Sequence, residues 1–411
     1  MAERIPPGFI AQIPKTDLHL HLDGSLRLSS LIDMARATGV ALPSQEEAGL
    51  RERVFKDRYR DLPEYLAGFR YTCAVLQNEE NLERAACELA EDCLAENVRY
   101  IEVRFAPQLH VRKHLGYEQV LRAVARGLER AATAHNRGPG VTGGDDVPFA
   151  FGLIVCAMRR FSAEMGAYFA GLIDRFRFAP PEELYAAASL EMVRAAVAIR
   201  DETGLPIVGF DLAGEEAGYP AGAHRAAYAH AHRNFLLKTV HAGEAYGPES
   251  IFQAITVCHA NRIGHGTFLF DHRLVRDTSI ADPRRYVEQL AEYLANRRIT
   301  VEVCLTSNLQ TTPGIARVAD HPVRQMIGHG LSVCLCTDNR LVSHTTATRE
   351  LQRLAEHVPL TREQFRNLVV AGFKGAFFPG PYREKRGYVR RVLDRYEAIE
   401  RDWAKEIEGW H

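Results

Sequence analysis

The sequence lacks the marks of several specialised protein classes. Its eight cysteines include no Cys-x-x-Cys pair, which argues against a zinc ribbon or a redox dithiol. No apolar run approaches the roughly 20 residues that span a bilayer, and segment 1–15 has no apolar targeting core. The net charge is only -1 at pH 7, so neither a nucleic acid nor an acidic membrane surface is indicated as a partner.

What the sequence does contain is enough apolar material for a large core. Hydrophobic residues make up 46% of the sequence, which is ample for a core. The length of 411 residues suits two average domains or one large α/β barrel with insertions. No internal repeat or linker divides the chain, so we expect a single domain over 1–411. The cysteines are scattered through apolar segments, and we interpret them, including Cys334 and Cys336, as buried free thiols. Such thiols are typical of a cytoplasmic protein.

Eight strand-like runs alternate with helical patterns along the chain. Most of the runs carry Val, Ile, Leu or Phe almost continuously, which is typical of parallel strands buried on both faces. The expected strands are 15–22, 98–105, 148–157, 206–212, 236–242, 262–268, 299–305 and 332–338. The clearest helical patterns cover 81–96, 117–135, 184–203 and 282–297.

This alternation predicts a (β/α)8 TIM barrel, with a doubly wound open sheet as the alternative. Segment 28–97 is too long for one strand–helix unit, so we expect extra helices there, over the mouth of the barrel. Residues 349–411 have the pattern of closing helices. The Gly-rich segment 135–146 precedes the third strand, and we expect a mobile loop on the face away from the site.

Polar residues gather where the expected strands end. They are His19 and His21 in the first strand, His241 with Glu244 after the fifth, His265 after the sixth and Asp338 after the eighth. His19 and His21 are two residues apart, so their side chains project from one face of the strand. Because the C-terminal strand ends of a barrel surround one pocket, we expect all six side chains to meet there.

This set of residue types predicts a metal-activated water. Neutral imidazoles together with a carboxylate suit a divalent metal of borderline softness, and Zn²⁺ above others. Zinc lowers the pKa of water to about 7, which supplies a nucleophile at neutral pH. Glu244 follows His241 closely and could protonate a ring nitrogen of the substrate, while His265 could orient the nucleophile.

The constellation resembles the adenosine deaminase family, within the wider amidohydrolase superfamily. The matching motifs lie at 16–24, 211–214, 240–244, 262–266 and 337–338, in the family's order and over about four-fifths of the chain. The resemblance implies one zinc ion held by His19, His21, His241 and Asp338. It also implies a reaction in which adenosine or 2′-deoxyadenosine is hydrolysed to inosine or 2′-deoxyinosine and ammonia.

The same resemblance implies roles for the remaining site residues. By analogy Glu244 is the proton shuttle to purine N1, and His265 lies beside the attacking hydroxide. The backbone of Gly214 would meet purine N3, and Asp23 would meet the ribose 5′-hydroxyl. One position departs from the family's usual pair of Asp residues, because Asn339 follows Asp338. An Asn amide can donate directly to purine N7, so this change keeps purine binding plausible.

Other polar residues have structural interpretations. His230 and His232 repeat the His-x-His spacing in a helical pattern, where residues two apart point in different directions. His329 lies between glycines but precedes the eighth strand, which places it on the stability face. Asp17 is interpreted as a supporting carboxylate, and Asp211 as either a functional residue or a helix cap.

Several alternative functions share parts of this pattern. The first is deamination of another 6-aminopurine, such as adenine or aminodeoxyfutalosine. Nucleotide deamination is disfavoured because no phosphate-binding cluster is evident. A binuclear amidohydrolase would need a bridging Lys in strand 206–212, which has none. Cytidine-deaminase chemistry lacks its His-x-Glu and Pro-Cys-x-x-Cys motifs. A non-catalytic purine-binding relative is disfavoured because every chemical role is filled.

Overall fold

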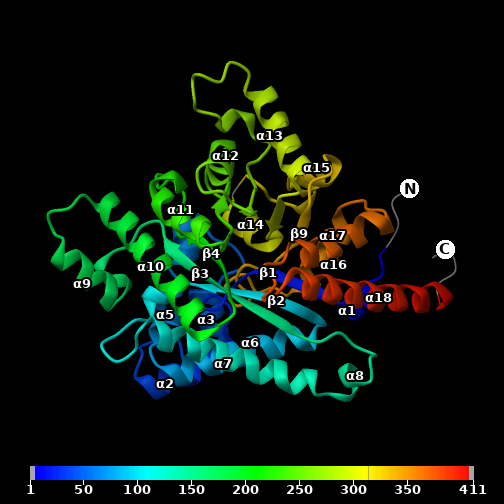
Figure 1. The fold of residues 1–411 in the computed structure, drawn as a ribbon, viewed down its shortest axis with the longest axis horizontal. Helices are drawn as coiled ribbons and strands as arrows, with labels where there is room; N and C mark the ends of the chain where they lie inside the picture. Colours follow the sequence, from blue (N-terminus) through cyan, green and yellow to red (C-terminus); the bar gives the residue numbers. More distant parts are fainter. Residues whose placement is uncertain (1–4, 313, 407–411) are drawn as a thin grey trace.

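The computed structural model describes residues 5–312 and 314–406, in which parallel strands form the centre and helices the outside (Figure 1). The strands are β1 Lys15–His21, β2 Val98–Phe105, β3 Ala150–Met158, β4 Ile207–Ala213, β5 Leu237–Lys238, β6 His241–Ala242, β7 Arg262–His265, β8 Thr300–Val303 and β9 Val333–Leu335. All of the eight expected strands are present, and the expected strand 236–242 is divided into β5 and β6.

The strands close into one barrel. Parallel pairing runs from β1 to β5 in one sheet and from β6 to β9 in a second. At the interruption between β5 and β6, Thr239 N donates to Phe210 O at 3.0 Å, so this strand still pairs with β4. At the other seam, His21 N donates to Asp338 O and Asp338 N donates to His19 O, both at 2.8 Å. The TIM-barrel prediction is confirmed, and the open sheet is ruled out.

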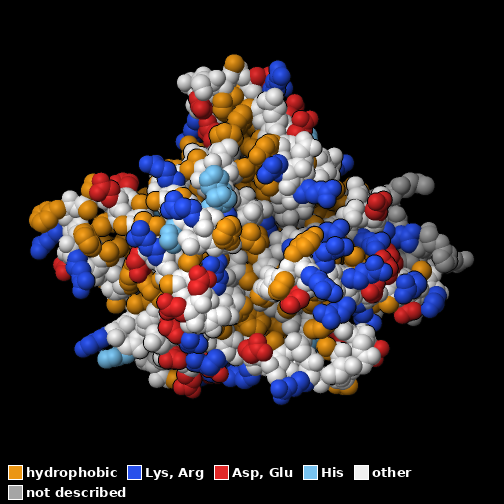
Figure 2. Space-filling view, in the orientation of Figure 1, with side chains coloured by type: hydrophobic (Ala, Val, Ile, Leu, Met, Phe, Trp, Pro, Cys, Tyr) orange, Lys and Arg blue, Asp and Glu red, His pale blue; other side chains and the backbone are white. Residues whose placement is uncertain are grey.

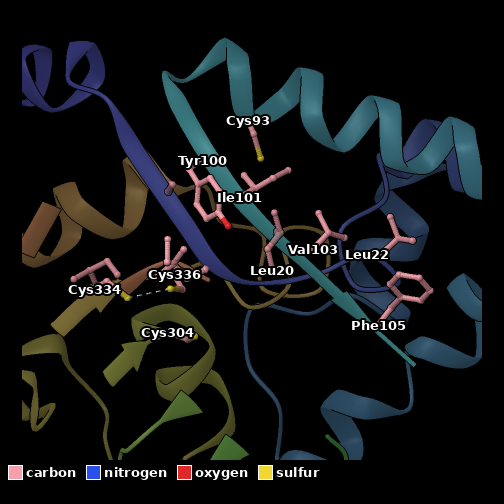
Figure 3. Close-up of a cluster of buried hydrophobic side chains, with 14 of the residues drawn as sticks. Leu20, Leu22, Cys93, Tyr100, Ile101, Val103, Phe105, Cys304, Cys334 and Cys336 are labelled. Carbon is pink, nitrogen blue, oxygen red and sulfur yellow. Dashed lines mark hydrogen bonds between the residues drawn. The ribbon is translucent and has the colours of Figure 1, made fainter. Parts of the chain in front are cut away.

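The alternation along β1 and β2 sends apolar and polar side chains to opposite sides. Leu20 of β1 and Val103 and Phe105 of β2 belong to the hydrophobic core, and Figure 3 shows Leu20 beside Val103 and Phe105 farther along β2, beside Leu22. Successive side chains in a strand point to opposite faces. The polar residues between these apolar positions therefore face the barrel interior.

Helices surround the barrel, and additional helices are inserted between β1 and β2 and follow β9. The α-helices are α1 Pro7–Gln12, α2 Leu28–Thr38, α3 Glu47–Arg53, α4 Leu62–Leu66, α5 Phe69–Val75, α6 Glu79–Ala95, α7 Tyr117–Asn136, α8 Pro139–Thr142, α9 Ala167–Arg175, α10 Pro181–Thr203, α11 Arg225–Arg233, α12 Pro248–Thr256, α13 Pro283–Arg297, α14 Leu305–Thr311, α15 Val323–Gly328, α16 Ala347–His357, α17 Arg362–Gly375 and α18 Tyr382–Glu406. Helices α2 to α6 form the expected insertion between β1 and β2. Helices α16 to α18 form the expected C-terminal closure.

The segment 135–146 is more ordered than the sequence suggests. It includes the end of α7 and the whole of α8, where Pro139 supplies a favourable first helical residue. Asp146 forms an ion pair of 2.8 Å with Arg99, which lies near the start of β2. The expected position at the N-terminal face of the barrel is therefore confirmed, but the expectation of a plain loop is wrong.

The surface and the cysteines agree with the expectations from composition. Lys, Arg, Asp and Glu are interspersed over the face in Figure 2, in keeping with the small net charge. No helix in residues 5–312 and 314–406 is both long and apolar enough to cross a membrane. All eight cysteines are free thiols, and seven of them are buried.

Candidate active site

The C-terminal strand ends bring three imidazoles and a carboxylate together. The Nε2 atom of His241 lies 3.0 Å from that of His19 and 3.2 Å from that of His21. Asp338 Oδ1 lies 3.5 Å from His19 Nε2 and 3.4 Å from His21 Nε2. All four residues are buried. The expected convergence of β1, β6 and the end of β9 is present.

Two residues at this site have strained backbones. His265 has φ = 65° and Asp338 has φ = 61°, both in the left-handed region. A residue other than glycine held there costs of order 1–3 kcal/mol, and such residues cluster at functional sites. Asp338 is held by its two backbone bonds to β1, and the preceding Thr337 donates its N–H and hydroxyl to Asp17. The supporting role expected for Asp17 is in keeping with these contacts.

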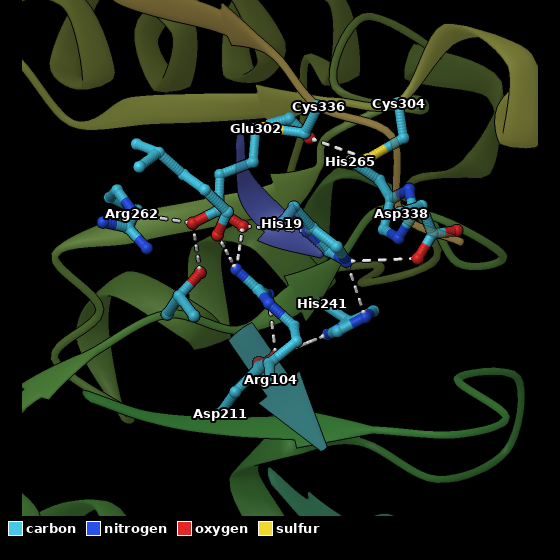
Figure 4. Close-up of polar contacts among 12 residues, drawn as sticks. His19, Arg104, Asp211, His241, Arg262, His265, Glu302, Cys304, Cys336 and Asp338 are labelled. Carbon is cyan, nitrogen blue, oxygen red and sulfur yellow. Dashed lines mark hydrogen bonds and ion pairs between the residues drawn. The ribbon is translucent and has the colours of Figure 1, made fainter. Parts of the chain in front are cut away.

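Buried carboxylates orient two of the imidazoles (Figure 4). His19 Nδ1 lies 2.9 Å from Glu302 Oε2, and His241 Nδ1 lies 3.0 Å from Asp211 Oδ2. Arg104 joins the two carboxylates, at 2.8 Å from Asp211 and 2.9 Å from Glu302. Burial would raise the pKa of Glu302, but neighbouring arginines hold it well below its usual value. Asp211 thus contacts an imidazole, and the helix-cap interpretation is wrong.

These contacts decide which nitrogens of His19 and His241 can bind a cation. A carboxylate accepts the Nδ1 proton, so each neutral ring keeps a lone pair on Nε2. Two such lone pairs facing each other at 3.0 Å repel unless a cation lies between them. Tetrahedral zinc with Zn–N bonds of about 2.0–2.1 Å would place neighbouring ligand atoms roughly 3.3 Å apart. The observed separations of 3.0–3.5 Å fit that requirement.

His265 lies in the same cluster but has a different environment. One donor atom each from His19, His241, His265 and Asp338 lie within 4.8 Å of one another. His265 Nε2 is buried without a hydrogen-bond partner and lies 3.6 Å from Glu244 Oε1. Its Nδ1 lies 3.0 Å from the amide nitrogen of Asn308, not from a carboxylate.

The turn that carries Glu244 is held by a residue that the sequence analysis missed. Glu216 accepts hydrogen bonds from four consecutive backbone N–H groups, at 243–246, over distances of 2.6–3.0 Å. It also accepts from the hydroxyl of Ser250. Gly243, at φ = 69°, allows the chain to turn around this carboxylate. Burial, reinforced by the charges of Asp338 and Glu216, raises the pKa of Glu244 to about 8, so a protonated carboxyl is available near neutral pH.

A cavity of about 520 Å³ opens onto these groups. Its lining includes His21, Asp23, Gly214, His241, Glu244, Asp338 and Asn339, with apolar walls from Leu62, Phe69, Met158 and Phe161. Every expected substrate contact therefore borders the cavity. Burial raises the pKa of Asp23 to about 7, and one of its oxygens has no partner.

Asn339 forms a hydrogen bond with the helical segment inserted between β1 and β2. Its Nδ2 donates to the hydroxyl of Tyr65 at 2.8 Å, while its Oδ1 is buried without a partner. The Tyr65 hydroxyl also lies 2.7 Å from Ser343 Oγ and 3.4 Å from Asp338 Oδ2. Tyr65 of α4 is therefore a part of the site that the strand-end pattern could not reveal.

The decoy histidines lie where the sequence analysis expected them. His230 and His232 belong to α11, and the cluster of donors around Asp338 includes neither of them. His329 follows α15 and stacks on Phe270, with ring centroids 5.0 Å apart. It precedes β9, whereas Asp338 follows that strand.

The barrel has the same fold as solved structures of an amidohydrolase and an adenine deaminase. An amidohydrolase from Burkholderia ambifaria, solved with bound zinc, superposes with a TM-score of 0.74 at 20% identity, covering 97% of this chain and 94% of that one. An adenine deaminase from Arthrobacter aurescens gives a TM-score of 0.72 at 22% identity, covering 93% and 98%. At these identities the likeness shows the shared fold.

Sequence similarity identifies the family. Residues 14–394 match the family model described as Adenosine deaminase. The chain is 34% identical to adenosine deaminase 1 of Streptomyces coelicolor over 401 residues, covering 97% of this chain and 90% of that protein. It is 36% identical to adenosine deaminase of Mycobacteroides abscessus over 377 residues, covering 90% and 92%. The chain belongs to the adenosine deaminase family and is a hydrolase acting on C–N bonds.

Proposed function

We propose that this protein hydrolyses adenosine and 2′-deoxyadenosine to inosine and 2′-deoxyinosine, with release of ammonia. The observation that carries the proposal is the pair of Nε2 lone pairs, on His19 and His241, that face each other beside the protonatable Glu244 and a cavity. The names of the relatives at 34–36% identity support adenosine over adenine, because the adenine deaminase shares only the fold.

We assign one zinc ion to His19, His21, His241 and Asp338. Their donor atoms have the separations that a tetrahedral ion needs, and Glu302 and Asp211 keep two of the imidazoles in the ligating tautomer. When bound, zinc supplies Lewis acidity that makes water a competent nucleophile at neutral pH. The zinc reported for the Burkholderia amidohydrolase supports this choice of metal.

Glu244 is the proton donor in this proposal. Hydrolysis adds the oxygen of water to C6 of the purine and expels the 6-amino group, and the ring must be protonated at N1 as the oxygen adds. A carboxyl with a pKa near the working pH is suited to that transfer. Of the two protons of the attacking water, one returns Glu244 to its acid form and the other goes to the 6-amino group, which leaves as ammonia, so the proton balance closes without another acid. His265 Nε2 lies 3.6 Å from Glu244 Oε1.

The substrate contacts follow from the lining of the cavity. We assign purine N3 to the backbone of Gly214, the ribose 5′-hydroxyl to Asp23 and purine N7 to Asn339. Gly214, at φ = 96°, has no Cβ that would hinder a close approach to its backbone, and Asp23 has an oxygen without a hydrogen-bond partner. One hydrogen of the Asn339 amide is used by Tyr65, which leaves the second for the purine.

We further infer a single hydrolase domain over 1–411 in the cytoplasm, with small purine nucleosides rather than nucleic acid as partners. The family match over 14–394 supports the single domain. The eight free cysteines support a reducing compartment.

The decisive experiment measures the change in ultraviolet absorbance that accompanies conversion of an aminopurine to an oxopurine. Zinc-loaded protein is given adenosine, 2′-deoxyadenosine, adenine, AMP and aminodeoxyfutalosine in parallel. Turnover of the first two alone is the expected result, and turnover of adenine or aminodeoxyfutalosine alone would replace the proposed substrate. Glu244→Ala should retain zinc and lose about 10²–10⁴-fold in kcat. Normal turnover by that variant would remove Glu244 as the proton donor.

A further inference from the structure

A chain of three hydrogen bonds leads from a backbone amide to the ring of His265. Val323 N donates to His321 Nδ1 at 3.0 Å. His321 Nε2 lies 3.2 Å from Asn308 Oδ1, and Asn308 Nδ2 lies 3.0 Å from His265 Nδ1. His265, Asn308 and His321 are all buried, with exposed fractions of 0–2%, so solvent does not compete for these positions.

We call this chain of hydrogen bonds, from Val323 N through His321 and Asn308 to His265, the relay. The direction of every hydrogen bond in it follows from the first one, which Val323 N donates. A backbone N–H can only donate, so His321 Nδ1 accepts and the proton of that ring lies on Nε2. His321 Nε2–H then requires an acceptor, which is the carbonyl oxygen of Asn308. The amide group of Asn308 is thereby turned toward His265, whose Nδ1 must accept. The remaining ring proton of His265 therefore lies on Nε2.

We propose that Asn308 and His321 hold His265 in the Nε2–H tautomer, so that His265 donates a hydrogen bond to the attacking water oxygen instead of ligating the metal. The identity of that oxygen rests on the proposed function. Asn308 and His321 are positioning residues, since each acts through His265.

The neighbouring imidazoles show the opposite arrangement. His19 and His241 each direct Nδ1–H at a carboxylate, which leaves Nε2 with a lone pair for a cation. His265 directs Nδ1 at an amide donor, so its Nε2 has a proton and no lone pair. Burial holds the pKa of His265 well below its usual value, in keeping with a neutral ring. Its buried Nε2 has no partner within the protein, as expected of a donor aimed at a ligand.

The tautomer can be measured directly by NMR of protein labelled with ¹⁵N-histidine, without and with zinc. The His265 signals are assigned by their loss in His265→Asn. The expected result is a pyrrole-type Nε2 and a pyridine-type Nδ1, with or without zinc. A pyridine-type Nε2, or an Nε2 signal that shifts as a metal ligand when zinc is added, would overturn the proposal.

Asn308→Asp tests the consequence for catalysis. The carboxylate accepts from both rings, so it moves the His265 proton to Nδ1 and removes the donor. In the serine-protease triad, a substitution that imposes the wrong histidine tautomer lowers kcat about 10⁴-fold. For Asn308→Asp we expect a kcat about 10³–10⁴-fold lower than that of the wild type, with the zinc stoichiometry unchanged. Asn261→Asp makes the same chemical change at an exposed position at the opposite end of β7 and should leave kcat within about twofold. Full turnover by Asn308→Asp with a swapped tautomer would overturn the donor role.

His321→Gln keeps the relay in a different side chain. A glutamine can accept from Val323 N and donate to Asn308, so the NMR pattern should persist and kcat should stay within about tenfold. Inversion of the His265 tautomer in this variant would contradict the relay. These readouts are separate from the substrate assignment, because inactivity of the wild-type protein toward every nucleoside would remove the proposed function and leave the measured tautomer standing.

Discussion

Glu216→Gln should displace Glu244 while the metal residues stay in place. Glu216 Oε1 accepts from Gly243 N and Ser250 Oγ, and Oε2 accepts from the N–H groups of 244–246. A glutamine has one acceptor oxygen, and its best orientation keeps that oxygen toward 244–246. Gly243 N–H then faces an amide donor and is left unpaired, which costs about 1–3 kcal/mol, and the other bonds lose their charge assistance. The summed loss is at least about 3 kcal/mol.

The assay compares kcat for adenosine, zinc content and urea unfolding in wild type, Glu216→Gln and Ser250→Ala. We expect Glu216→Gln to lose about 100-fold in kcat, because a small displacement of a catalytic group has that effect, and to keep its zinc. Ser250→Ala removes one neutral donor and should cost about 1 kcal/mol of stability. In a Glu244→Ala background, Glu216→Gln should cause no further loss of kcat. Wild-type kcat in Glu216→Gln, or the same loss in both backgrounds, would refute this reasoning.

Three more expectations concern the groups behind the site. Arg104→Met should lower the free energy of unfolding by about 3–5 kcal/mol, because two buried carboxylates lose their shared cation, and a loss below about 1 kcal/mol in urea denaturation would contradict this. Asp211→Asn should weaken zinc binding about 10–100-fold in competition with a chelator, since an amide does not hold the ligating tautomer of His241. Affinity equal to wild type would exclude that role. Burial lowers the pKa of His321 to about 3, so below pH 6.5 the unfolded chain binds a proton that the folded protein does not. Wild-type stability should therefore fall with decreasing pH by up to about 1.4 kcal/mol per pH unit more than that of His321→Gln, and parallel curves would contradict the assignment.

The strand positions and the residues at their ends were predictable because both depend on local patterns. Nearly continuous apolar runs marked most strands of the barrel, and the alternation with a period of two in the first strand placed His19 and His21 on one face. The parallel topology then brought His241 and Asp338 to the same end of the barrel. The backbone of Asp338 pairs with β1, as the order of strands in a closed barrel requires. The sequence pattern was therefore enough to predict the position of Asp338.

The supporting residues were not predictable in the same way. Arg104 and Glu302 are charges within apolar strands, which is a signal in itself, but their partnership links positions 198 residues apart. Tyr65 comes from the inserted helices, whose path over the barrel mouth follows no periodicity. Glu216 resembles any loop carboxylate until the turn at 243–246 is folded around it.

By itself the sequence determined the barrel and the chemistry at its mouth, because strand alternation and residue type are local properties. Which group lies at the Nδ1 atom of each imidazole, and with it the tautomer that we propose for that ring, was decided by the tertiary structure. His19 and His265 are the same residue type at equivalent strand ends, yet Glu302 stands behind one ring and Asn308 behind the other. The physical reason is that a tautomer depends on the direction of the hydrogen bond to Nδ1, and that direction is set by partners distant in the chain.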